Sequence, residues 1–350
     1  MAEVDPSTSI RHFLEPLAPF LNDPSVTEIV INRPQQVYVE ARGRWVATEV
    51  PELTYAYLLQ LGVANAHYAG ENLAFSSTSP ILSCVLPDGE RAQYVMPPAC
   101  KAGTVSLTIR KPSFQVREID EYISGGFFDK IKPPREFSEA DEELLELQKH
   151  LFDADDVAQK RAHFLERCVE LGKNIVIAGG TGSGKTTFMK ALMQRIPTDE
   201  RIITIEDVPE LVYGLPKHDN IVNLFYPSEQ TAKSTVTAAG LLRSCLRMKP
   251  DRILLAELRG GETFDFLNVC MSGHGGSITS CHAGSCQGVF DYLALKVLQS
   301  PVGSTLPYPV IQRLLNLVID VVVHIANDRE IGRHITEIWC QLPRPEGRGL

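Results

Sequence analysis

The stretch "NIVIAGGTGSGKTT" (residues 174–187) predicts the fold of the second half of the chain. It begins with the strand-like run "NIVIA" and continues through a glycine-rich turn. The spacing from Gly179 to Lys185 and Thr186 satisfies the pattern G-x-x-x-x-G-K-[ST] of a loop that binds phosphate between a strand and a helix. The segment therefore predicts the first strand, loop and helix of an α/β domain.

Each part of this loop suits the phosphates of a nucleotide. Glycines let successive backbone N–H groups turn inward around phosphate, and the N-terminus of the helix adds its positive end. Lys185 can bridge the β- and γ-phosphates, and Thr186 can hold Mg²⁺. The sequence "GTGSG" also fits part of a dinucleotide fingerprint, but Lys185 and Thr186 favour the phosphate loop. The expected nucleotide contacts are Gly180, Thr181, Gly182, Ser183, Gly184, Lys185, Thr186 and Thr187.

The character of the chain changes along its length. Residues 26–110 contain short alternating strand patterns and turns, with a helix expected near 53–68. Residues 113–160 are polar and charged, and Ser138 is a plausible helix N-cap with Asp141 at the third helical position. After residue 173 strands and helices alternate, which predicts a mainly parallel sheet. The expected division is a smaller α+β domain over 1–112, a linker with charged helices over 113–160, and a nucleotide-binding domain over 161–350.

Composition limits the class of protein. The 350 residues, 44% of them hydrophobic, are enough for about two domains with large cores. The net charge of -9, from 34 basic and 43 acidic residues, gives no strong sign of direct nucleic-acid binding. No run of 18 apolar residues occurs, and the start "MAEVDPSTSI" lacks the pattern of a secretory signal. We expect no transmembrane segment and a cytosolic location.

Carboxylates follow two of the predicted strands. "IITIED" ends in Glu206 and Asp207, and "RILLAEL" carries Glu257. Ligands bind at the carboxyl ends of the strands in sheets of this kind, so these groups are candidates to serve Mg²⁺ and water. Acidic residues at strand ends are also common as helix caps or in solvated turns, and that alternative stays open.

The stretch "TSCHAGSC" (279–286) places His282 between Cys281 and Cys286. These residue types suit a zinc site, a nucleophile with its base, or plain packing. In a strand, neighbouring side chains point to opposite faces, which separates Cys281 from His282. The eight cysteines are scattered with no C-x-x-C pair, so neither zinc nor a disulfide framework is expected.

Four motifs in this order resemble those of the secretion ATPases. They are the Walker A motif "GGTGSGKTT", the Asp box "TIEDVPEL", the atypical Walker B motif in "RMKPDRILLAELRGGE" and the His box "SGHGGSITSCHAGS". The opening "VTEIVINRPQQVYVEARGRW" and the later "SLTIRKPS" are similar to the N-terminal domain of the VirB11-like branch, the traffic ATPases of type IV secretion systems. The chain departs from many members at Ala256, where they have Gly before the glutamate.

The resemblance implies a RecA-like P-loop domain that hydrolyses ATP with Mg²⁺. By the matching motifs, Lys185 and Thr186 would hold phosphate and Mg²⁺. Glu257 and Glu206 would order or activate the attacking water, with Glu206 also a candidate Mg²⁺ ligand, directly or through water.

Two further residues gain roles from the resemblance. His282 would sense the terminal phosphate, which makes Cys281 and Cys286 packing residues. Arg110, in "TIRKP", would reach the nucleotide from the N-terminal domain and neutralise charge on the γ-phosphate. The alternative for Arg110 is an ordinary surface charge beside a linker.

For the whole protein, the resemblance implies a homo-hexamer at the cytoplasmic face of the bacterial inner membrane. It would power type IV secretion, as substrate transport or pilus assembly, with other channel components and protein or DNA cargo as partners. One alternative is a pilus-retraction or type II secretion motor, although the latter usually carries a C-x-x-C zinc insertion that this chain lacks. Another is an ATP-dependent switch or scaffold with little turnover. A nucleic-acid translocase is disfavoured by the acidic balance.

Overall fold

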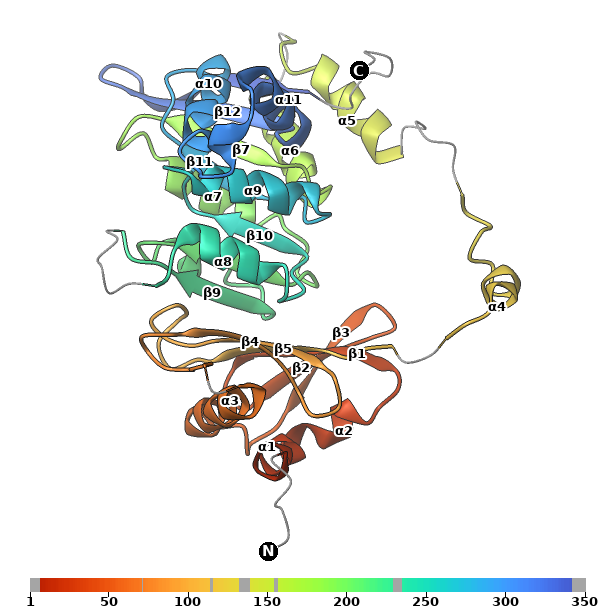
Figure 1. Ribbon diagram of the computed structural model, residues 1–350. Helices are drawn as coiled ribbons and strands as arrows, with labels where there is room; N and C mark the ends of the chain where they lie inside the picture. The colour runs from red at the N-terminus through yellow and green to blue at the C-terminus, as the bar shows by residue number, and fades with distance from the viewer. Residues whose placement is uncertain are drawn as a thin grey trace, which may run out of the picture.

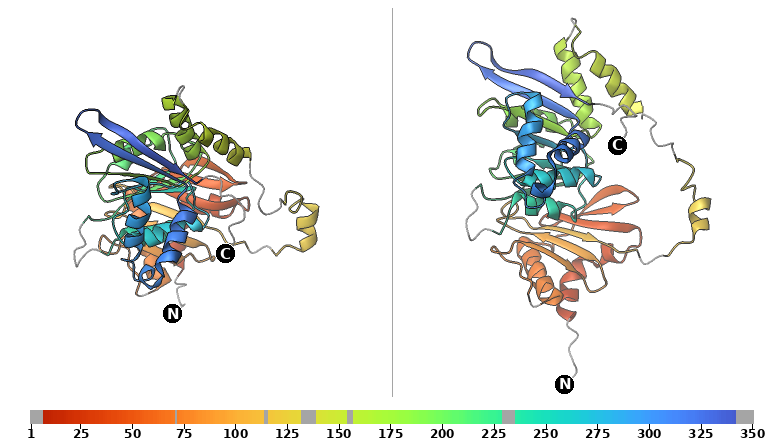
Figure 2. Two further views of the ribbon diagram at one scale, coloured as in Figure 1. Left: turned by 90° about the horizontal axis from the view of Figure 1, so that it is seen from above. Right: turned by 45° about the horizontal axis from the view of Figure 1, so that its top comes forward.

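The computed structural model describes residues 7–70, 72–113, 116–131, 139–153, 157–228 and 235–341. The described chain forms two bodies that stack end to end (Figure 1). The tilted view at the right of Figure 2 shows the same arrangement. Within the described residues, no helix has the length and apolar character needed to cross a bilayer. The predicted N-cap Ser138 lies outside the described residues.

The first body is an antiparallel sheet with helices packed against one face (Figure 1). Its strand order is β3-β2-β1-β6-β5-β4. Thr54 caps the long helix, because its side chain accepts a hydrogen bond from the backbone N–H of Tyr57 at 3.2 Å. The predicted strands and the helix near 53–68 are confirmed. The elements are α1 (Thr8–Leu14), η1 (Glu15–Leu17), α2 (Ala18–Leu21), β1 (Val26–Arg33), β2 (Gln36–Ala41), β3 (Arg44–Glu49), α3 (Tyr55–Ala69), β4 (Ile81–Val85), β5 (Arg91–Val95) and β6 (Ser106–Arg110).

The second body is an α/β domain with two sheets, ordered β10-β8-β9 and β11-β7-β12-β13. All strand pairs are parallel except β12 with β13, which confirms the predicted, mainly parallel sheet. The elements are β7 (Ile175–Gly179), α7 (Lys185–Met193), β8 (Ile202–Glu206), η2 (Leu211–Tyr213), β9 (Ile221–Phe225), α8 (Ala238–Cys245), β10 (Arg252–Leu255), α9 (Glu262–Met271), β11 (Ile278–Cys281), α10 (Cys286–Val297), η3 (Gly303–Thr305), α11 (Tyr308–Val318), β12 (Val321–Asp328) and β13 (Gly332–Cys340).

The two sheets meet along a seam between β10 and β11, where serine hydroxyls supply part of the hydrogen bonding. Ser277 Oγ donates to the carbonyl of Ile253 at 2.6 Å, and Ser280 Oγ donates to that of Ala256 at 2.8 Å. One backbone bond, from Leu258 N–H to the carbonyl of Ser280 at 2.8 Å, also crosses the seam. The two strands that are followed by Glu257 and His282 therefore lie side by side.

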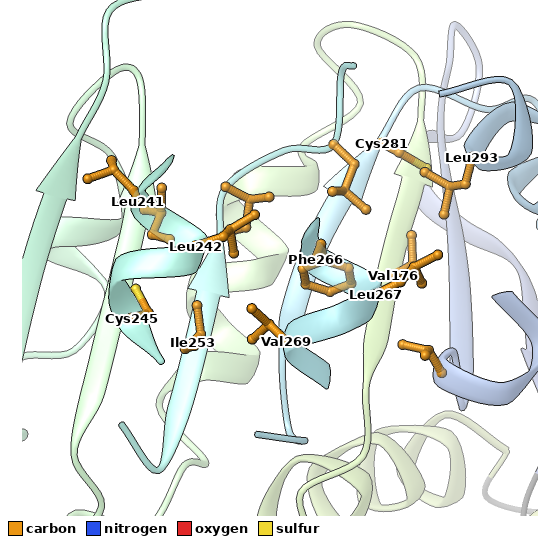
Figure 3. Packing of buried hydrophobic residues seen from close by; sticks show 14 of the residues in the cluster. Val176, Leu241, Leu242, Cys245, Ile253, Phe266, Leu267, Val269, Cys281 and Leu293 are labelled. Carbon is orange, nitrogen blue, oxygen red and sulfur yellow. The ribbon is translucent and has the colours of Figure 1, made fainter. Parts of the chain in front are cut away.

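Helices α8, α9 and α10 cover one face of these sheets with apolar side chains. Figure 3 shows Leu241, Phe266 and Leu293 from the three helices packed against the strand residues Val176 and Ile253, all within one buried cluster. Each such side chain contributes about 1.5–3 kcal/mol when it is fully buried. This packing fixes the strands beneath it, so the loops at their carboxyl ends start from defined positions.

The connection between the two bodies divides into parts with different packing. It contains α4 (Ile119–Ser124), α5 (Glu139–Lys149) and α6 (Val157–Glu170), and α4 lies apart from both bodies in Figures 1 and 2. In contrast, Leu144 and Leu151 are buried in the same cluster as Ile175 of β7. Because these side chains belong to the core of the α/β domain, we propose that this domain begins near residue 139 rather than at 161.

The first body is attached to the edge strand β9 of the second. Backbone hydrogen bonds join Lys101 N–H to the carbonyl of Asn223 at 3.1 Å and Phe225 N–H to that of Ala99 at 2.9 Å. The loop after β5 thus extends the edge of the α/β sheet by a short pairing. This contact covers an edge strand that would otherwise present unpaired backbone groups.

A buried arginine strengthens the same contact. Arg201 is fully buried, and its guanidinium donates to Asn32 Oδ1 of the first body at 2.7 Å. It also donates to Asn220 Oδ1 at 2.6 Å and to the carbonyl of Met248 at 2.9 Å, both in the second body. Burial lowers the pKa of Arg201 to about 10, so the group stays charged at pH 7. One cation therefore holds oxygens from both bodies.

Replacing this cation should loosen the contact between the bodies. In an Arg201→Met variant, Asn32 and Asn220 keep buried polar groups without the donor, and the free energy of unfolding should fall by about 2–4 kcal/mol. Urea denaturation would measure the loss, and limited proteolysis would report separation of the bodies. The matched control is Arg195→Met, which removes an exposed ion pair with Glu166 and should cost about 1 kcal/mol or less. Equal losses in the two variants would contradict the proposed role of Arg201.

Candidate active site

A cavity of about 400 Å³ lies at the carboxyl ends of β7, β8, β10 and β11. The glycine-rich loop after β7 forms one wall, and residues after the other strands form the rest. Six of the eight predicted loop contacts line the cavity, and Gly180 and Ser183 do not. The six are Thr181, Gly182, Gly184, Lys185, Thr186 and Thr187.

Two glycines of the loop are required by its geometry. Gly179 has a φ of +151°, and a Cβ there would lie 2.2 Å from the carbonyl oxygen of Ile325 on β12. Gly184, the residue before α7, has a φ of +97° in the left-handed region that favours glycine. The loop can therefore pass close to β12 and turn sharply into the helix.

The two residues after the loop bring a cation and a hydroxyl into the cavity. Lys185 Nζ donates to the carbonyls of Gly179 at 2.9 Å and Gly180 at 3.1 Å, and burial lowers its pKa. Thr186 lines the cavity beside it. Within the described residues, no group of three His, Cys, Asp or Glu side chains could hold a metal. Hard oxygen donors such as Thr186 and the nearby carboxylates suit Mg²⁺, which takes few protein ligands and binds largely through phosphate and water.

Two carboxylates on the opposite wall are joined by Arg259. Arg259 Nε donates to Glu257 Oε2 at 2.7 Å, and its guanidinium also pairs with Asp207. Asp207 accepts a further hydrogen bond from Ser228 Oγ at 2.9 Å. Although burial opposes it, these hydrogen bonds from Ser228 and Arg259 hold the pKa of Asp207 below its usual value. Asp207 is thus kept ionised beside the cavity.

His282 meets the other oxygen of Glu257. Its Nε2 lies 2.7 Å from Glu257 Oε1, close enough for an ion pair when the imidazole is protonated. The contact is not aligned as a hydrogen bond, and Oε1 is a buried acceptor without a hydrogen-bond partner. Because Arg259 holds Oε2 and Oε1 makes no hydrogen bond, Oε1 can accept a proton or a hydrogen bond from a group inside the cavity.

The structure places Glu206 outside the cavity. Its side chain is fully buried, and its carboxylate accepts hydrogen bonds from the backbone N–H groups of Glu210 at 2.7 Å, Leu211 at 2.6 Å and Val212 at 3.1 Å. It does not line the cavity. These hydrogen bonds cap the turn after β8, which is the alternative that the sequence left open for this residue. Since successive residues point to opposite sides of an extended chain, its neighbour Asp207 faces the cavity instead.

The structure places Arg110 away from this cavity. This exposed side chain lies 3.5 Å from Glu28 Oε1, and it does not line the cavity at the loop. It lines a separate cavity of about 380 Å³ between the two bodies, with Arg91 and Arg247. The first body packs against the β9 edge and not over the strand ends, so Arg110 cannot serve the site of its own chain in this arrangement.

Sequence reasoning missed two arginines of the site. Arg259 stands two residues after Glu257 in "AELRGGE", so its closeness to that carboxylate could have been noticed. Arg333 on β13 also lines the cavity, and its Nε donates to the carbonyl of Gly182 at 3.2 Å. Only the pairing of β12 with both β7 and β13 brings Arg333 there, and no local pattern indicates it.

The cysteines that flank His282 lie in the apolar core. Figure 3 shows Cys281 among the buried side chains between β7 and α10. Cys286 belongs to the same cluster, and its Sγ donates to the carbonyl of Val322 at 3.4 Å. Their side chains are thus engaged in packing, while His282 points to the cavity.

Comparison with known proteins agrees with this site. Residues 137–347 match the family "Type II/IV secretion system protein". The chain is 54% identical over 343 residues to the type IV secretion system protein VirB11 of Brucella abortus, covering 97% of this chain and 91% of that protein. It is 40% identical over 349 residues to PtlH of Bordetella pertussis, also a type IV secretion system protein, covering 98% of this chain and 99% of that protein.

A solved structure extends the likeness to three dimensions. The VirB11 ATPase of the Brucella suis type IV secretion system, in complex with sulphate, superposes with a TM-score of 0.86 at 53% identity. The match covers 95% of this chain and 98% of that one, so it includes both bodies. The chain therefore belongs to the type II/IV secretion system protein family and, within it, to the VirB11-like ATPases of type IV secretion systems.

Proposed function

We propose that the protein is a Mg²⁺-dependent ATPase that works as a homo-hexamer and converts ATP hydrolysis into movement that powers type IV secretion. The observation that carries this proposal is the meeting of Lys185, Thr186 and Glu257 in one cavity at the ends of parallel strands. A cation for phosphate, a hydroxyl for Mg²⁺ and a carboxylate for water are the parts that phosphoryl transfer to water needs.

The loop and its helix would bind the phosphates. Lys185 exchanges its two carbonyl partners for oxygens of the β- and γ-phosphates, and the positive end of α7 adds to the attraction. Thr186 and the nearby carboxylates would hold Mg²⁺. The ion would supply positive charge that neutralises the phosphates.

The opposite wall would handle the attacking water. Glu257 Oε1 is the free acceptor that can orient the water or take its proton, because Arg259 fixes the other oxygen. His282 contacts that same oxygen. A negative charge placed beside His282 would therefore act electrostatically on both the imidazole and the carboxylate of Glu257. This coupling supports the role of His282 as a sensor of the terminal phosphate.

The proposed ring follows from the position of Arg110. Since Arg110 does not reach the cavity of its own chain, we assign it to the site of a neighbouring subunit, where it would neutralise the γ-phosphate. The Arg201 contact supports a rigid unit made of both bodies of a single chain. Nucleotide between chains would then change the angle between whole subunits.

The cellular setting rests on the relatives. The similarity to type IV secretion system proteins supports an assignment to type IV secretion over a pilus-retraction or type II secretion motor. We infer a place at the cytoplasmic face of the bacterial inner membrane, with other channel components as partners and protein or DNA as cargo. The remaining alternative, a switch or scaffold with little turnover, differs in a measurable quantity, the steady-state rate of ATP hydrolysis.

The first test removes the cation of the loop. Lys185→Ala should lower kcat for ATP by about 100-fold or more, because no other flexible cation of the loop can reach the β- and γ-phosphates. A phosphate-release assay would measure the rate. Lys190→Ala, on the same helix but outside the cavity, is the matched control and should hydrolyse ATP at the wild-type rate. Wild-type turnover by Lys185→Ala would refute the ATPase assignment.

The second test separates the two glutamates. Glu257→Gln should keep ATP binding and lose about 100-fold or more in kcat, since the amide preserves size but cannot act as a base. Glu206→Gln should instead lower the free energy of unfolding by about 1–3 kcal/mol, because an amide oxygen cannot replace a carboxylate that accepts three backbone N–H groups. Calorimetric titration and urea denaturation would distinguish the two outcomes. A stable Glu206→Gln protein with no turnover would restore the original assignment.

The third test asks which subunit supplies Arg110. Neither Arg110→Ala nor Lys185→Ala should hydrolyse ATP alone, but co-assembly of the two should restore about a quarter of the wild-type rate, because a random ring pairs an intact loop with a neighbour's intact arginine at that frequency. Each variant mixed with itself is the control. A mixture as inactive as its components would mean that Arg110 acts within its own chain or not at all.

A further inference from the structure

Arg333 occupies the side of the cavity opposite to Glu257 and His282. The strand order β11-β7-β12-β13 places the glycine-rich loop, which follows β7, between β11 on one side and β12 with β13 on the other. His282 follows β11, and Glu257 follows β10 beyond the seam. Arg333 comes from β13, so the loop separates it from the groups that face the terminal phosphate.

The side chain of Arg333 lies across the outside of the loop. Its Nε donates to the carbonyl of Gly182 at 3.2 Å. Its Cδ would lie 3.2 Å from a Cβ on Gly184, so the aliphatic stem covers that glycine closely. A loop that binds phosphate turns its N–H groups inward, and a carbonyl that accepts from Arg333 is turned outward. The guanidinium therefore stands at the rim of the phosphate cradle.

An ATP molecule in this cavity has only one way to lie if the proposed function holds. Its γ-phosphate must face Glu257 and His282 across Lys185, and the nucleoside must then leave on the other side of the loop. That side carries Arg333. Arginine suits a nucleoside, because its planar guanidinium can stack on a base and its N–H groups can donate to ribose oxygens.

We propose that Arg333 is a residue of the same chain that binds the nucleoside part of ATP. This inference rests on the proposed function, because it assumes that the cavity binds a nucleotide. It predicts that Arg333 contributes to affinity for any ligand with a base and ribose and contributes nothing to the affinity for phosphates alone.

Binding of three ligands to the full-length protein in Mg²⁺ would test the role. By isothermal titration calorimetry, Arg333→Ala should bind ATP and ADP about tenfold more weakly than wild type, a loss typical of one charged or stacking contact. Inorganic tripolyphosphate should bind both proteins equally. In turnover assays KM for ATP should rise with kcat at saturation unchanged. Arg333→Lys, which keeps the charge and a donor for Gly182, should recover part of the lost affinity.

Arg329→Ala is the matched control, an exposed arginine on the same hairpin that does not line the cavity, and it should match wild type for all three ligands. Equal losses for tripolyphosphate and ATP in Arg333→Ala would overturn the inference in favour of a phosphate contact or a collapsed loop. Unchanged ATP affinity in Arg333→Ala would overturn it outright while leaving the proposed function intact. A wild-type protein that binds tripolyphosphate but no nucleotide would overturn both.

Discussion

The burial of one positive charge, that of Arg201, sets the arrangement of the whole chain. A charge removed from water is costly unless oxygens surround it, and those around Arg201 come from both bodies. Neither body alone supplies the full set. The first body is therefore held at the β9 edge, which leaves the strand ends of the second body open and carries Arg110 away from them. The proposed exchange of arginines between subunits follows from this contact together with the backbone pairing at β9.

Carboxylates at neighbouring positions do different work in the second body. The carboxylate of Glu206 accepts hydrogen bonds from three backbone N–H groups of the turn that follows β8. The same turn places Asp207 beside Arg259, and Arg259 fixes one oxygen of Glu257. A buried structural acid thus orients, through two ion pairs, the acid that faces the phosphates.

Much of the fold could be predicted from the sequence because the decisive patterns are local. The loop from Gly179 to Thr186 and the strands before it are continuous in the chain, so their spacing predicts both geometry and ligand. Which of Glu206 and Asp207 faces the cavity depends on where β8 ends and on the side to which each residue points, and the sequence "TIED" does not show that.

Contacts between segments that are distant in the chain could not be predicted, because no local sequence pattern indicates them. Arg333 lies about 150 residues from the loop it touches, and only the two pairings of β12 bring them together. The charged composition of 113–160 suggested a linker, yet Leu144 and Leu151 are buried in the same cluster as Ile175 of β7. The position of the first body depends on Arg201, whose partners come from elements on both sides of the connection.

The seam between β10 and β11 has a mechanical consequence. A full backbone ladder resists sliding because its bonds must break together, whereas a serine hydroxyl can rotate and follow its acceptor as the strands shift. The seam thus resists sliding less than a full backbone ladder would, and the contact between Glu257 and His282 crosses it. Charge that appears or disappears beside those two residues therefore acts where a small displacement of one half-sheet against the other meets the least resistance.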